Sequence, residues 1–242
     1  VSECGDTRNF FNRAGFFDSL ADGVDVFPVR PNESAAKKYK GNSNSLVEFG
    51  AISPQYEAEG VGENKSIALA LGNSFVSKSS DQYRVAAFTM FSELVGNVSR
   101  HSESPIDGFA ALQFYSPPHK ANHIQTVVSD SGLGVSRTLR PSLEQNYPKL
   151  HARFGGDTIE SDIGLVKETF SKGNVSRFGA GNGLGFKSTR EQATKFDADL
   201  SIRQETFNIE LSYRGGLLTA TRVDKGLSRI YGTHICFDFM VD

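Results

Sequence analysis

The sequence predicts an α+β protein, a two-layer sandwich in which helices cover one face of a single mixed sheet. Two observations support this fold class. Residues 81–101 carry apolar side chains every three or four positions, as an amphipathic helix does. Alternation typical of half-buried strands fills the segments 108–115, 123–129, 199–205, 207–213, 217–222 and 233–240. Because helices and strands are partly segregated along the chain, we expect one sheet with helices on one side.

The predicted helix at 81–101 has the clearest pattern in the chain. It contains no proline, and Gly96 is its only glycine. Its apolar stripe is formed by Val85, Phe88, Phe91, Leu94 and Val98. One face of this helix is therefore expected to lie on the core.

Residues 1–75 are predicted to form a small N-terminal lobe of unassigned role, followed by one domain over residues 76–242. Residues 45–52 predict a strand, and residues 58–64, rich in Gly and Glu, are expected to be exposed. A short amphipathic helix is indicated by apolar residues at helical spacing: Phe10, Phe11, Ala14, Phe17 and Leu20.

A long, mostly polar connection at about 137–178 is predicted to be a lid over a binding site, since long insertions often have this role. Within it, residues 158–170 predict a helix. A second helix is expected over residues 184–196, directly after a glycine-rich loop.

Composition excludes several classes of protein. The formal net charge is −2, with 38% hydrophobic residues in 242, so nucleic acid is not an expected partner. No apolar run has the length of a membrane span, and no membrane partner is expected. Cys4 and Cys236 form no C-x-x-C pair, which argues against a zinc or redox motif. We expect a cytoplasmic protein.

Glu93 and Asn97 lie four residues apart on the predicted helix, so they project from the same face. An Asn carbonyl is a suitable ligand for Mg²⁺, which keeps several waters and binds few protein oxygens. A carboxylate beside it can deprotonate an attacking water or hydroxyl. The pair taken alone also fits an ordinary polar helix edge.

Asp130 ends an apolar strand and precedes a turn with Gly132 and Gly134. Glycines let a flat ligand approach the backbone closely. A buried carboxylate there can accept a hydrogen bond from an adenine amino group. An ordinary Asp-Ser-Gly turn is the simpler alternative for this stretch alone.

Alternating glycines precede the helix expected at 184–196: Gly179, Gly181, Gly183 and Gly185. Backbone N–H groups at a helix start form a site for phosphate. The spacing differs from a dinucleotide fingerprint, where Leu184 would need to be flexible, and from a Walker loop, where Phe186 replaces the last glycine. A flexible hinge is the alternative.

Together, these stretches resemble the N, G1 and G2 boxes of the GHKL ATPase superfamily, whose fold is the Bergerat fold. Gly232-Thr233 resembles the terminal Gly-Thr motif of that family. The resemblance covers residues 81–242. It implies ATP and Mg²⁺ as ligands, with Glu93 as general base, Asn97 as metal ligand and Asp130 as adenine anchor. It further implies nucleotide contacts from Gly132, Gly134, Gly179, Gly181, Gly183, Leu184, Gly185 and Thr233.

Within this family, the chain resembles stand-alone ATP-binding proteins of the histidine-kinase-like group. No phosphoacceptor hairpin precedes the predicted N box, and no transducer domain is expected. The leading expectation is an Mg²⁺-dependent ATPase module whose lid closes over nucleotide to control a protein partner. A protein serine kinase of the anti-sigma type and a nucleotide-gated interaction module without turnover are the alternatives. A homodimer is left open, as is a phosphate contact by His101, Arg137, Arg140 or Arg177.

Overall fold

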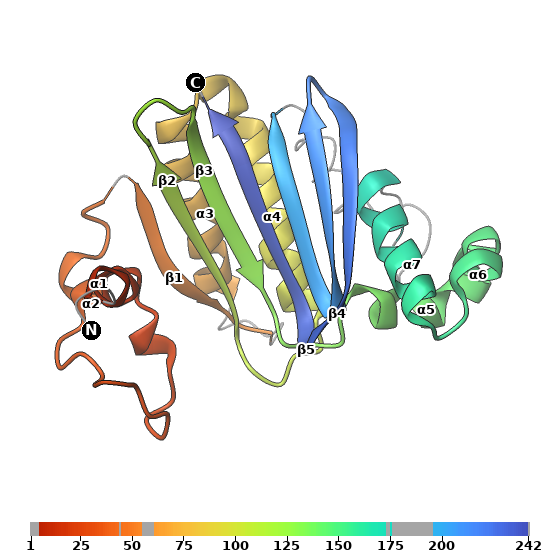
Figure 1. Cartoon of the computed structure of the whole chain (residues 1–242), viewed down its shortest axis with the longest axis horizontal. Helices are drawn as coiled ribbons and strands as arrows, with labels where there is room; N and C mark the ends of the chain where they lie inside the picture. The colour runs from red at the N-terminus through yellow and green to blue at the C-terminus, as the bar shows by residue number, and fades with distance from the viewer. Residues whose placement is uncertain (1–4, 44, 55–60, 173–174, 176–195, 242) are drawn as a thin grey trace.

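The computed structural model describes residues 5–43, 45–54, 61–172, 175 and 196–241. Its centre is a five-stranded sheet with the strand order β1-β2-β3-β5-β4 (Figure 1). The strands are β1 (Leu46–Ile52), β2 (Gly108–Tyr115), β3 (Asn122–Ser129), β4 (Ala198–Arg214) and β5 (Leu217–Val241). The α+β class predicted from the sequence is confirmed.

The sheet is antiparallel at every described strand pair, so the prediction of a mixed sheet was wrong for this part of the chain. The connection between β2 and β3 gives the physical reason. It spans only residues 116–121, whereas a parallel crossover needs about a dozen residues or more.

The long strand β4 folds back on itself. A straight strand of 17 residues would separate its ends by about 50 Å. Instead, an Arg214 guanidinium N–H donates to the Ala198 carbonyl oxygen at 3.1 Å, and Ser201 Oγ lies 2.8 Å from Asn208 Oδ1. The bend is at Glu205, where φ is +48°.

β5 bends in the same way. Its residues 217–225 pair with 207–214 of β4, and its residues 233–239 pair with 198–204. Each strand therefore makes two passes across the sheet: residues 198–204 and 207–214 in β4, and residues 217–225 and 233–239 in β5. The four strands predicted after residue 198 correspond to these passes.

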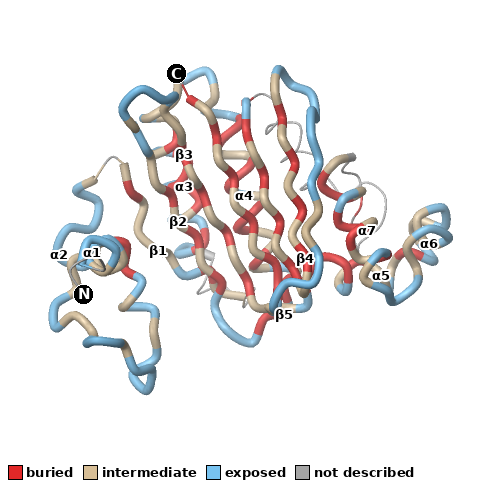
Figure 2. Tube along the Cα trace, viewed as in Figure 1, coloured by how far each residue is buried: buried red, intermediate tan, exposed pale blue. Residues whose placement is uncertain are grey.

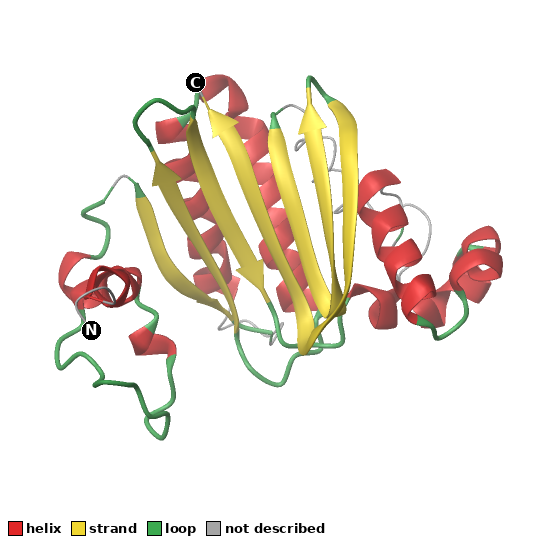
Figure 3. Cartoon of the chain, viewed as in Figure 1, coloured by secondary structure: helices red, strands yellow, loops and turns green. Residues whose placement is uncertain are grey.

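Two long helices, α3 (Val61–Lys78) and α4 (Arg84–His101), cover one face of the sheet (Figures 1 and 3). The helix predicted over 81–101 is thus confirmed; residues 81–83 form a 3-10 turn before it. Buried residues run along the middle strands and α4 (Figure 2). The centre of the core contains an aromatic group made by Phe75, Phe91, Phe196 and Phe239.

α3 was not predicted, and it spans the predicted boundary between the N-terminal lobe and the main domain. The boundary predicted between residues 75 and 76 falls inside this helix. Ile52 of β1 and Leu71 of α3 have no exposed surface and belong to the same core as α4. Residues 45–75 therefore pack as part of the sheet and its helical layer.

The N-terminal segment lies beside the β1 edge of the sheet (Figure 1). It contains α1 (Gly5–Ala14), a 3-10 turn (Phe17–Ser19) and α2 (Ala35–Tyr39). Arg13 of α1 forms an ion pair with Glu48 of β1, and the Phe16 ring lies 6.4 Å from that of Phe49. These contacts attach the segment to the outer strand.

Helices α5 (Val135–Asn146), α6 (Pro148–Phe154) and α7 (Ile159–Lys172) lie beside the β4 side of the sheet. They fill most of the predicted lid, and α7 confirms the helix expected over 158–170. Leu143 and Leu165 have no exposed surface. The described part of the predicted lid is therefore a helical layer packed on the core. Among the described helices, none combines the length and apolar character needed to cross a bilayer.

Candidate nucleotide site

A pocket that is partly open to solvent lies between α4, the end of β3, the start of α5 and the second pass of β5. Pockets lined mostly by apolar side chains with a few polar groups are typical of small-molecule sites. Its apolar wall is formed by Leu94, Val98, Val128, Val135, Leu139 and Ile235. Asn97, Asp130 and Thr233 add polar groups to it.

Asp130 lies at the end of β3 with only 8% of its surface exposed. Its carboxylate Oδ1 accepts a hydrogen bond from the backbone N–H of Gly132 at 2.8 Å. Burial raises the pKa of the Asp130 carboxyl above its ordinary value of 3.8, against the opposing effects of backbone hydrogen bonds from Gly132 and Thr233 and of the nearby His234. A buried, perturbed carboxyl group inside a pocket is a typical feature of a binding site.

Thr233 lies beside Asp130 because β5 pairs with β3 at this end of the sheet. The Asp130 backbone N–H donates to the Thr233 carbonyl oxygen at 3.0 Å. Thr233 is buried, and both residues line the pocket. The structure thus brings together two residues that are 103 positions apart in the sequence and that were predicted to share a site.

The glycines near Asp130 allow backbone segments to pack closely. A Cβ on Gly132 would lie 1.8 Å from the Ser102 carbonyl oxygen, and Leu133 N–H donates to that oxygen at 2.9 Å. Gly134 has φ of +81° and directly precedes α5. Gly132 therefore packs the turn against the end of α4, and Gly134 orients α5 along the pocket.

Asn97 projects from α4 into the pocket. Its side-chain Nδ2 is buried, and it has no hydrogen-bond partner among the described residues. An unsatisfied buried polar group costs free energy, so it indicates a position where a ligand or water supplies the missing partner.

Glu93, one turn before Asn97, is not among the residues that line the pocket. Its carboxylate lies 3.7 Å from the Arg100 guanidinium on the same helix, with 30% of the side chain exposed. The structure therefore places the predicted base and metal ligand on one helix but brings only Asn97 into the pocket.

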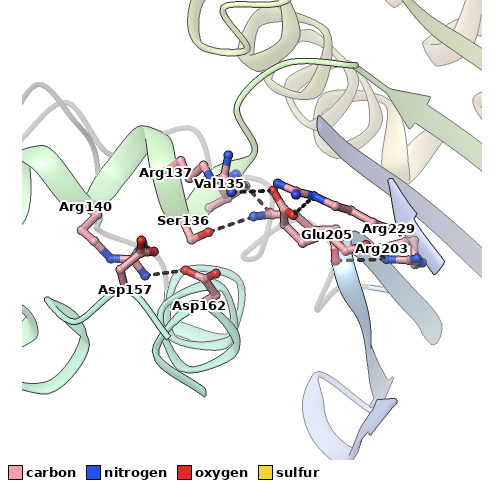
Figure 4. A network of polar contacts seen from close by, with 10 residues as sticks. Val135, Ser136, Arg137, Arg140, Asp157, Asp162, Arg203, Glu205 and Arg229 are labelled. Atoms are coloured by element: carbon pink, nitrogen blue, oxygen red, sulfur yellow. Dashed lines mark hydrogen bonds and ion pairs between the residues drawn. The ribbon is translucent and has the colours of Figure 1, made fainter. Parts of the chain in front are cut away.

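Two predicted lid arginines already have carboxylate partners. Arg137 lies 3.2 Å from Glu205, and Arg140 pairs with Asp157 and Asp162 (Figure 4). His101 lines the pocket through the last turn of α4. The glycine loop (Gly179, Gly181, Gly183, Leu184 and Gly185), Arg177 and most of the helix predicted over 184–196 lie outside the described residues.

Gln204 was not predicted from the sequence to have any role near the pocket. It is fully buried on β4 and bonds to the start of α5. Its signal was present in the alternation: Leu200, Ile202 and Gln204 occupy the same face of the strand, so one polar residue stands in an apolar row.

The described residues contain no cluster of three or more His, Cys, Asp or Glu side chains suited to a metal ion. The chemistry still fits Mg²⁺ bound mainly by nucleotide phosphates, because such sites use one or two protein ligands and waters. Asn97, whose side chain lines the pocket, would offer its side-chain carbonyl oxygen as that ligand.

A comparison with models of protein families finds no match to this chain, and a comparison with curated proteins finds none either.

Proposed function

We propose that this protein binds ATP with Mg²⁺ in a GHKL-type pocket of a Bergerat fold and hydrolyses it to control a protein partner. The observation that carries the proposal is the buried Asp130 carboxyl beside Thr233 at one side of an apolar pocket, with the Asn97 side chain on another. This combination supplies an acceptor for an adenine amino group, apolar walls for its ring and an oxygen ligand for a phosphate-bound ion.

In this proposal the chain's own residues have separate tasks. The Asp130 carboxylate accepts a hydrogen bond from the base, and Thr233 lies beside it. Leu94, Val98 and Ile235 exclude water from the base. Asn97 would hold Mg²⁺, which neutralises phosphate charge when bound. Glu93 would orient or deprotonate the attacking water once its carboxylate leaves Arg100.

Binding is tested by titration calorimetry with ADP and with a non-hydrolysable ATP analogue, with and without Mg²⁺. Asp130→Asn should weaken adenine-nucleotide binding at least about ten-fold, because a carboxylate that accepts a hydrogen bond contributes about 1.5–3 kcal/mol. Asp238→Asn is the matched control, since Asp238 is half-buried on the sheet and pairs with His123 at 2.7 Å. No binding by the wild-type protein, or equal losses in both variants, would refute the assignment.

A nucleotide-gated interaction module without turnover is the second candidate. The observation that favours it is the Glu93–Arg100 ion pair, since this carboxylate is engaged by a guanidinium and lies outside the pocket wall. Phosphate release by wild type and Glu93→Gln separates the candidates. Turnover that is lost in Glu93→Gln with binding retained supports the ATPase; absent turnover with intact binding supports the module.

A further inference from the structure

Gln204 is a polar side chain with no exposed surface, on the core face of β4. Its Oε1 accepts from the Val135 backbone N–H at 3.0 Å, and its Nε2 donates to Ser136 Oγ at 2.9 Å. Figure 4 shows these contacts at the start of α5. Both ends of the amide are thus used to bind residues 68 and 69 positions away in the sequence.

The Val135 N–H belongs to the first residue of α5, and the first N–H groups of a helix have no partner within it. A preceding Ser, Thr, Asp or Asn normally provides the acceptor. Here Gly134 precedes the helix and offers no side chain. Gln204 therefore performs the capping role from a distant strand. A Cβ on Gly134 would lie 2.8 Å from the Gln204 amide carbon, so the glycine also makes room for it.

The neighbouring residue provides a second attachment. Glu205, whose side chain is 13% exposed, pairs with Arg137 of α5 at 3.2 Å and with Arg229 of β5 at 2.8 Å (Figure 4). Arg203 donates to the carbonyl oxygens of Gln204 and Glu205 at 3.0 and 2.7 Å, which supports the bend. The bend of β4 therefore holds three consecutive residues of α5, from Val135 to Arg137.

Val135 and, one turn later, Leu139 form part of the pocket wall. We infer that Gln204 is a positioning residue for the nucleotide pocket: it caps α5 and thereby holds Val135 and Leu139 in the pocket wall. This inference rests on the proposed function for the identity of the ligand. It also assigns Leu139, which lies within the predicted lid, to the fixed wall of the site.

Amide hydrogen exchange by NMR tests the cap without any ligand. Gln204→Met keeps the length of the side chain and removes both hydrogen bonds. Exchange protection at Val135 and the following turn should fall about ten-fold, the effect of losing a buried hydrogen bond. Gln113→Met is the matched control, because the Gln113 side chain on β2 donates to the Phe114 carbonyl oxygen at 2.7 Å and, among the described residues, to no part of α5. Wild-type protection at Val135 in Gln204→Met would overturn the inference.

Calorimetry with ADP tests the consequence for binding. Gln204→Met should weaken ADP about ten-fold at unchanged stoichiometry, and Gln113→Met should not. Lost protection with unchanged ADP affinity would overturn the positioning role. If Gln204→Met does not fold, Ser136→Ala removes one of the two bonds and is judged by the same two measurements. A wild-type protein that binds no adenine nucleotide contradicts the proposed function alone, since exchange at Val135 still decides whether Gln204 holds the wall.

Discussion

The backbone of Gly232 lies directly against that of Asp130: a Cβ on Gly232 would be 2.0 Å from the Asp130 carbonyl oxygen. Gly232 also has φ of +80°, which side chains rarely adopt. This contact sets the distance between the end of β3 and the second pass of β5. Asp130 and Thr233 therefore meet in the pocket because Gly232, the residue directly before Thr233, has no side chain.

Gly232→Ala should destabilise the protein by more than about 2 kcal/mol, because the methyl group meets backbone that cannot move aside easily. Gly215→Ala is the matched control. Gly215 has φ of +56° with open space around it, so that variant should be destabilised only by the conformational cost of about 1–2 kcal/mol. Urea unfolding measures both. Equal losses would show that the contact with Asp130 has no cost of its own.

The raised pKa of Asp130 predicts a pH dependence with a definite sign. Between its ordinary value of 3.8 and the higher value in the folded protein, the folded state binds more protons than the unfolded one. Stability should therefore fall as pH rises through this window, and Asp130→Asn should remove that part of the dependence. Urea unfolding of both proteins at intervals from pH 4 to 7 tests it. A wild-type advantage that grows with rising pH would contradict the prediction.

Asn97→Leu should separate stability from binding. The change removes a buried Nδ2 that has no partner among the described residues and keeps the branching of the side chain at Cγ, so the ligand-free protein should stay within about 1 kcal/mol of wild type or become more stable. Nucleotide affinity should at the same time fall and lose its dependence on Mg²⁺. Thermal unfolding and calorimetry with and without EDTA measure the two effects. Strong destabilisation would instead indicate a structural role for Asn97.

Arg140 should contribute to stability through Asp162, since the two side chains are only 15% and 13% exposed. Arg140→Ala leaves a largely buried carboxylate unpaired and should cost about 2 kcal/mol or more. Arg84→Ala, which breaks an exposed pair with Asp81, should cost about 0.5 kcal/mol or less. A similar loss in both, by urea unfolding, would rule out an anchoring role for Arg140.

The packing of α3 predicts where the chain tolerates truncation. A protein that starts at residue 76 lacks β1 and Phe75, whose ring packs on Phe91 and Phe239, and should not unfold cooperatively. A protein that starts at residue 45 retains these elements and should. Circular dichroism during thermal unfolding distinguishes them. Cooperative unfolding of the protein that starts at residue 76 would instead support a domain boundary near residue 75.

The sequence predicted α4, β2 and β3 well because each has an uninterrupted period. It failed at α3, whose first residues fall in the Gly- and Glu-rich stretch 58–64 that was expected to be exposed. In the structure, a Cβ on Gly72 would lie 2.7 Å from the Phe88 ring, so this glycine permits close packing of α3 and α4. α5 was not predicted either, and it continues past Pro141.

For similar reasons, the sequence indicated some of the residues at the pocket and missed others. Asp130, Gly134, Asn97 and Thr233 line one pocket, because strand ends and one helical face place them there. Gln204 was missed because its role depends on a tertiary contact with α5 rather than on local spacing. The position of Glu93 relative to the pocket depends on a side-chain rotamer and a neighbouring arginine, which periodicity does not specify.

The strand order has a consequence for biosynthesis. β3 pairs with β5, whose paired residues emerge from the ribosome more than 100 residues later. Until then, one edge of β3 exposes unpaired N–H and C=O groups, and the Asp130 turn has no Thr233 beside it. Completion of the sheet and assembly of the pocket are thus the same late event. A nascent chain that lacks β5 would therefore present an unpaired strand edge to which another chain can pair.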